Sequence, residues 1–151
     1  MSENPFCPTQ AGFLWFLRNI VSVPQAALPD DAGVISWVYL RASQIVLPVM
    51  QCVDPSGYTQ AVYNLGADLL INWAQDQPGQ VYFANARTKY NCGKFRGGVV
   101  ASAADEGTST SLNVIEALNT LTVADLQNLN TPYGQAYIGF AQQFGTVWGM
   151  S

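Results

Sequence analysis

Residues 87–116 interrupt a chain in which apolar residues otherwise recur at helical spacing. The stretch contains Gly97-Gly98, followed by two short runs rich in valine, serine and threonine on either side of Asp105-Glu106-Gly107. Such runs disfavour a helix, and the acidic pair with glycine supplies turn chemistry. The sequence therefore predicts a mainly α protein, a helical bundle from which a β-hairpin or long loop projects at about 97–116. Because a lone two-stranded ribbon is marginal in water, we expect it to lean on something, such as the same ribbon of an adjacent subunit.

Capping residues and apolar periodicity place the helices of this bundle. Thr9 is a good N-cap, Pro55 suits a first helical position, and Thr131-Pro132 combines an N-cap with a first-turn proline. Pro48 must kink or end the second helix. The predicted helices span about 10–21, 30–47, 55–76, 123–129 and 132–144, and a short helical piece is expected at 82–90. At 151 residues the chain is predicted to be one domain, 1–151, with four to five helices around one core.

The segment 55–76 is the clearest amphipathic helix in the chain. Its apolar stripe consists of Ala61, Val62, Leu65, Leu69 and Trp73, and its polar residues are Asn64, Asp68, Asn72 and Gln75. Three of the four tryptophans, Trp15, Trp37 and Trp73, are interpreted as core residues. Trp148 lies beyond the last predicted helix and is a candidate for docking into a neighbouring subunit.

The residues that usually carry catalysis are scarce. The chain has no histidine, which removes the commonest general base and every Ser-His or Cys-His nucleophile pair. Asp30-Asp31 is interpreted as helix-start stabilisation, and Asp105-Glu106 as a solvated hairpin tip or a partner contact. Cys92 lies between two lysines that could lower the pKa of its thiol, but nothing near it in sequence would complete a catalytic pair. We therefore predict no catalytic residue, cofactor or metal site, and no enzyme.

Composition favours a protein whose surface is covered by neighbours. Charged residues make up 11% of the chain, against about 25% in an average soluble domain. The three cysteines are an odd number without metal spacing, which fits assembly in a reducing cytoplasm. No apolar run approaches the roughly twenty residues of a membrane span, so no membrane partner is expected.

A basic cluster opens the interrupting stretch. Four of the six basic residues, Arg87, Lys89, Lys94 and Arg96, fall within ten positions and are interleaved with Tyr90 and Phe95. This pattern suits a solvated loop, an acidic protein surface or a phosphate backbone. The net charge of −4 gives the whole molecule no electrostatic footprint for nucleic acid, so DNA contact would have to come from this cluster alone.

Several segments resemble those of a family of small tailed-bacteriophage proteins, the head-to-tail adaptor (head-completion, or neck) proteins. The matching text is FLRNIVSVPQAALPD (16–30), AVYNLGADLLINWAQDQPG (61–79), YFANARTKYN (82–91), the Ser/Thr-rich run ending in SLNV, LTVADLQNLNTPYGQAYIGFAQQFG (121–145) and the final VWGM. The resemblance spans nearly the whole chain. These segments are structural signatures and contain no active-site motif.

The resemblance implies a structural virion protein without enzymatic activity. Such proteins form a ring under the portal, typically of twelve copies, that extends the DNA channel and docks the next neck or tail component. The implied partners are the portal protein, a neck or tail component and neighbouring copies; packaged DNA passes without sequence-specific binding. The implied location is the virion neck, after assembly in the bacterial host cytoplasm.

The candidate partner or oligomer contacts lie in the interrupting stretch and the C-terminal segment. They are Arg87, Lys89, Lys94, Phe95, Arg96, Asp105, Glu106, Leu112, Val114 and Trp148. In a closed ring the contacts are heterologous, so different patches of one subunit must match each other. The alternative is a small nucleic-acid-binding or regulatory module that uses the basic segment Arg87–Arg96. An enzyme using Cys92 or a carboxylate pair is the least favoured hypothesis.

Overall fold

The computed structural model describes residues 4–92 and 130–143, and this part of the chain is mainly helical. Its helices are α1 (Gln10–Asn19), α2 (Gly33–Ile45), α3 (Met50–Val53), α4 (Pro55–Trp73), α5 (Tyr82–Lys89) and α9 (Pro132–Gln143). The prediction of a mainly α protein is confirmed. The predicted helix at 123–129 and the predicted β-ribbon at 97–116 lie outside the described residues.

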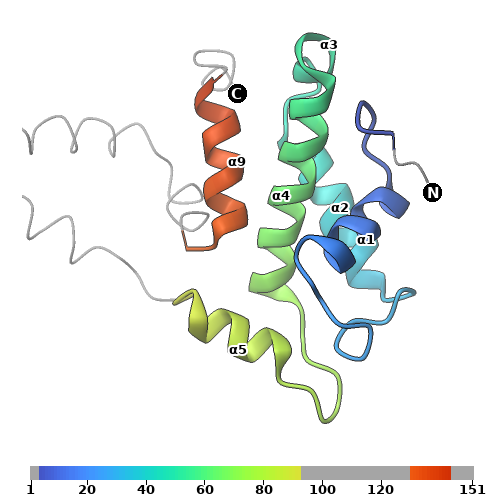
Figure 1. Cartoon of the computed structure of the whole chain (residues 1–151), viewed down its shortest axis with the longest axis vertical. Coiled ribbons are helices and arrows are strands. Elements are labelled where there is room, and N and C mark those ends of the chain that lie inside the picture. Colours follow the sequence, from blue (N-terminus) through green and yellow to red (C-terminus); the bar gives the residue numbers. More distant parts are fainter. Residues whose placement is uncertain (1–3, 93–129, 144–151) are drawn as a thin grey trace, which may run out of the picture.

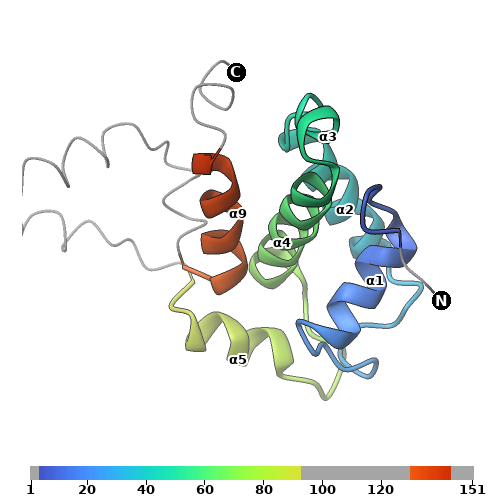
Figure 2. The ribbon, with the colours of Figure 1, turned by 45° about the horizontal axis from the view of Figure 1, so that its top comes forward.

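Helix α4 lies at the centre of the bundle (Figure 1). Helices α1 and α2 lie on one side of it and α9 on the other, and α5 runs across the end where α4 finishes. Figure 2 shows the same arrangement from a second direction. Helix α4 packs most extensively against α9 and α2. Twelve of its 19 residues are buried, so neighbours cover more of this helix than the single apolar stripe predicted from its sequence.

Three of the predicted helix starts, at residues 10, 55 and 132, are confirmed. The Thr9 hydroxyl accepts the N–H of Gly12 at 3.0 Å, and the Thr131 hydroxyl accepts that of Gly134, also at 3.0 Å. At the start of α4 the Asp54 carboxylate accepts the N–H of Gly57 at 2.9 Å, with Pro55 as first helical residue. Each cap satisfies one N–H that the helix itself leaves without a partner.

Helix α1 ends earlier than predicted, and helix α2 begins later than predicted. Helix α1 ends at Asn19 instead of residue 21, and Ser22 then adopts a left-handed backbone with φ of 63°. Helix α2 begins at Gly33 instead of residue 30. The reason is that the Asp30 carboxylate forms an ion pair with Arg18 of α1 and so belongs to the preceding connection.

Proline and extended residues set the remaining boundaries. Helix α2 ends at Ile45, because Val46 is extended two residues before Pro48, and the separate short helix α3 follows. Helix α4 ends at Trp73 instead of residue 76, since Ala74 is extended. The described part thus has six helices where four to five were predicted, because Pro48 separates α3 from α2 and the piece at 82–90 is the complete helix α5.

The core lies where α1 and α2 meet α4. Its fully buried side chains include Phe13, Leu17, Ile35, Val38, Leu65 and Leu70. The Phe13 ring packs directly on Gly66, where a β-carbon would come within 2.8 Å of the ring. A glycine at this point of α4 lets the two helices approach closely around the phenyl ring.

The prediction that Trp15, Trp37 and Trp73 are core residues is wrong. Their side chains are 47%, 53% and 44% exposed. The space between α1, α2 and α4 is filled by smaller aliphatic side chains and Phe13, and the tryptophans lie at its margin.

Candidate assembly surface

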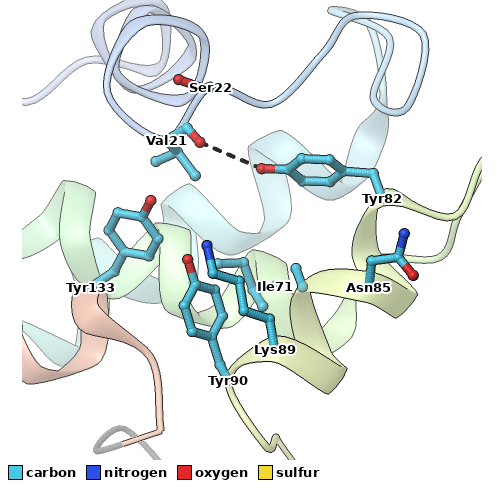
Figure 3. Close-up of a pocket in the computed structure, with 9 residues that line it drawn as sticks. Val21, Ser22, Ile71, Tyr82, Asn85, Lys89, Tyr90 and Tyr133 are labelled. Carbon is cyan, nitrogen blue, oxygen red and sulfur yellow. Dashed lines mark hydrogen bonds between the residues drawn. The ribbon is translucent and has the colours of Figure 1, made fainter.

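A hollow of about 410 Å³ lies between α5, the end of α4, the start of α9 and the loop after α1. Three tyrosines line it, Tyr82, Tyr90 and Tyr133, together with Lys89 (Figure 3). Lys89, Tyr90 and Tyr133 point toward one another, and the Lys89 ammonium lies 5.3 Å from the centre of the Tyr90 ring. Tyr82 donates a hydrogen bond from its hydroxyl to the Val21 carbonyl at 3.4 Å.

Two phenols of this hollow, Tyr82 and Tyr133, are weaker acids than a free tyrosine. Burial, the neighbouring phenols Tyr90 and Tyr82, and a hydrogen bond with Tyr90 raise the pKa of Tyr133 to about 12. Burial, with a smaller contribution from Tyr90, also raises the pKa of Tyr82. These hydroxyls stay protonated at neutral pH, and the lining residues carry no carboxylate. The lining residues that the structure describes can donate hydrogen bonds and offer ring faces, but none of them is a carboxylate that could accept a proton.

Of the predicted contact residues, the structure describes Arg87 and Lys89. Arg87 lies on α5 and donates hydrogen bonds from its guanidinium to the carbonyls of Ile71 at 3.1 Å and Ala74 at 2.7 Å. These are the carbonyls that the last turn of α4 leaves without helical partners. Arg87 therefore joins α5 to α4, whereas Lys89 is exposed. The other candidates, Lys94, Phe95, Arg96, Asp105, Glu106, Leu112, Val114 and Trp148, lie outside the described residues.

The expectation that flanking lysines lower the pKa of Cys92 is wrong. Burial is the largest influence on this thiol and raises its pKa, and the nearby Asp68 carboxylate adds to the rise. Arg87 acts in the opposite direction but is outweighed. The thiol is thereby kept from its nucleophilic form at neutral pH.

The sequence did not reveal the role of Asp68. It falls among the polar positions of α4, yet its side chain is 1% exposed because α9 covers that side of the helix. The hydroxyl of Thr131 donates a hydrogen bond to it and at the same time caps α9. Burial raises the pKa of Asp68 to about 7, although the Thr131 hydrogen bond lowers it in part.

The most distinctive surface of the described chain is apolar. Trp37 of α2 and Trp73 at the end of α4 lie with their ring centres 4.5 Å apart, and each is about half exposed. Leu40, three residues after Trp37 on α2, is 56% exposed. We call these three residues the tryptophan face. Residues three apart lie on neighbouring positions of one helix surface, so Leu40 extends the exposed face along α2.

Within residues 4–92 and 130–143, no three metal-ligating side chains are grouped so as to hold an ion. None of the helices in these two ranges combines the length and the apolarity needed to cross a bilayer.

No protein-family model, no curated protein and no solved structure matches the chain.

Proposed function

We propose that this chain is a structural virion protein of a tailed phage, a head-to-tail adaptor whose copies form a ring under the portal. The observation that carries the proposal is the tryptophan face. Two indoles in contact and a neighbouring leucine are left about half open to water on one side of α2 and α4. Exposed apolar groups gathered on one face mark interaction sites, because water favours covering them.

The chemistry of the chain is consistent with a role in assembly. Catalysis would need an acid or base tuned near neutral pH and aimed at a substrate site. Asp68 has a raised pKa but faces Thr131 inside the bundle, and the hydroxyls of Tyr82 and Tyr133 remain protonated. The low charged fraction of 11% fits subunits that cover one another's sides. The segment resemblance to neck proteins supplies the identity of the assembly.

The experiment is to mix the purified chain with the portal protein encoded in the same genome and to image the product by electron microscopy. We expect a ring of this chain on the tail-facing end of the portal, with portal alone as the control. In the intact virion its density should lie in the neck. Density in the tail tube or on the capsid exterior, or no binding to the portal, would contradict the proposal.

The alternative use of the basic segment in DNA binding makes a different prediction. Binding through Arg87–Arg96 would weaken steeply with salt, by about one logarithmic unit of slope for each phosphate contact. Because Arg87 already donates to the carbonyls of α4, we expect no DNA retardation in a gel shift at low salt. A salt-sensitive complex would favour the nucleic-acid module over the adaptor.

A further inference from the structure

A second exposed apolar surface lies at the other end of α4. Val49 and Val53, four residues apart around α3, are 60% and 71% exposed, and Phe6 is 60% exposed. The Sγ atom of the adjacent Cys7 lies 4.0 Å from the side-chain nitrogen of Gln51, so this N-terminal segment lies beside α3. We call Phe6, Val49 and Val53 the valine edge.

The two surfaces are separated by the whole length of α4. Val53 directly precedes the N-cap of α4, and Trp73 is its last residue. A helix of 19 residues is about 28 Å long at 1.5 Å per residue. A single neighbour could contact both surfaces only by spanning this whole length. Each subunit therefore offers two separate apolar contacts.

We infer that, in the proposed ring, the tryptophan face of one copy binds the valine edge of the next copy; this inference rests on the proposed function. The occupant of each surface is thus a second copy of this chain. A contact between two unlike surfaces is heterologous, and repeating it produces a closed ring or an open filament instead of a symmetric dimer.

Charge supports this pairing. Arg41 is exposed and lies four residues after Trp37, on the same side of α2. In the described part of the chain the only ion pair is that of Arg18 with Asp30, so Arg41 has no acidic partner there. Asp54 lies next to Val53 and is partly exposed; one of its carboxylate oxygens, Oδ1, accepts the Gly57 N–H at the start of α4. Docking the tryptophan face on the valine edge would thus bring an arginine toward a carboxylate.

The carboxylate nearest in sequence to Trp73, that of Asp76, is directed toward the start of α5. Both oxygens of Asp76 are engaged within the subunit, accepting the N–H groups of Phe83 at 2.7 Å and Ala84 at 2.9 Å. Among the described residues, the tryptophan face is thus flanked by an arginine without an acidic partner, and the valine edge by an aspartate. Opposite charges at the rims would select this orientation over face-to-face pairing, in which two arginines would meet.

The test uses two variants that each block one surface. The face variant carries Trp37→Ser and Leu40→Asp, which removes apolar area and places a carboxylate opposite Asp54. The edge variant carries Val49→Lys and Val53→Lys, which places ammonium groups opposite Arg41. Ile20→Asp and Val81→Lys are matched controls, because both residues are more than half exposed and lie on neither surface. Far-UV circular dichroism checks that each variant is folded.

Self-association is measured by sedimentation velocity over a wide concentration range. We expect the wild type and both controls to associate with increasing concentration, and each blocked variant alone to associate at least about tenfold more weakly. An equimolar mixture of the two blocked variants should form a heterodimer and stop there, because it contains one intact face and one intact edge.

Three outcomes would overturn the inference: a wild type that remains monomeric throughout, a blocked variant that associates like the wild type, or a mixture that forms no heterodimer. An edge variant that still dimerises would point to face-to-face contact. The portal experiment is independent of these results. Variants that still form rings on the portal would refute the surface assignment and leave the adaptor proposal intact, whereas a wild type that never binds the portal would refute the adaptor proposal itself.

Discussion

Replacing Asp68 by asparagine should make the protein more stable at neutral and alkaline pH. The carboxyl is buried between α4 and α9, and its pKa is about 7 instead of 3.8. The folded state therefore binds a proton that the unfolded state has already released between these two values. The stabilising effect of protonation is complete below about pH 3.8 and is lost as pH rises through 7.

The size of the effect follows from the pKa difference. The shift is about 3 units, and at about 1.4 kcal/mol per unit it lowers the free energy of unfolding by about 4 kcal/mol between acid and alkaline pH. This is a large share of the 5–15 kcal/mol typical of a small domain. Asparagine keeps an oxygen that can accept the Thr131 hydroxyl but has no charge to bury. We expect Asp68→Asn to match the wild type near pH 4 and to exceed its stability by a few kcal/mol at pH 8.

Urea denaturation followed by circular dichroism from pH 4 to pH 9 measures this difference. Asp31→Asn is the matched control, because Asp31 is exposed and the same chemical change there should leave the pH profile unaltered. A carbon-13 NMR titration of the Asp68 carboxyl would report its pKa directly. The reasoning is refuted if Asp68→Asn has the same pH slope as the wild type, or if it is less stable than the wild type at pH 8.

Three further substitutions test the packing of the bundle by the same denaturation assay. Gly66→Ala should destabilise by about 1–3 kcal/mol, because the new methyl group meets the buried Phe13 ring; unchanged stability would mean that the ring can move aside. Arg87→Met should lose about 1–2 kcal/mol with its two bonds to α4, while Lys89→Met, at an exposed position, should change little; equal effects would contradict the joining role of Arg87. Thr9→Ala should lose about 1 kcal/mol and Thr9→Ser much less, since serine preserves the cap; equal losses would show that the hydroxyl cap is not what matters.

Local signals in the sequence predicted the helix starts well. Thr9 and Thr131 each accept an N–H three residues away, and Pro55 acts through its own fixed backbone angle, so the sequence near these helix starts contains most of the required information. The start of α2 and the ends of α1, α2 and α4 were predicted less well. The start of α2 depends on Asp30 pairing with Arg18 across a connection, which no local pattern reveals.

The largest errors concern which side of a helix is covered. Periodicity shows that Trp73 and Leu69 share a stripe, but not that this stripe leaves the core at Trp73, which is 44% exposed although Ile71 and Ala74 beside it are buried. In the same way, Asp68 reads as a polar surface residue until α9 is placed over it. Tertiary packing decides both cases, and the tryptophan face was hidden from sequence analysis because large aromatic residues are usually assigned to the interior.

Side-chain hydrogen bonds from both sides hold the connection between α4 and α5 in place. Arg87 of α5 donates to the last carbonyls of α4, and Asp76, just after α4, accepts the first N–H groups of α5. Because Arg87 and Asp76 each form two hydrogen bonds, α5 is held against the end of α4 and does not hang from it by the chain alone. A pulling force applied to the chain beyond Cys92 would therefore be transmitted to α4. We expect α5 to detach only when the hydrogen bonds of Arg87 and those of Asp76 break together.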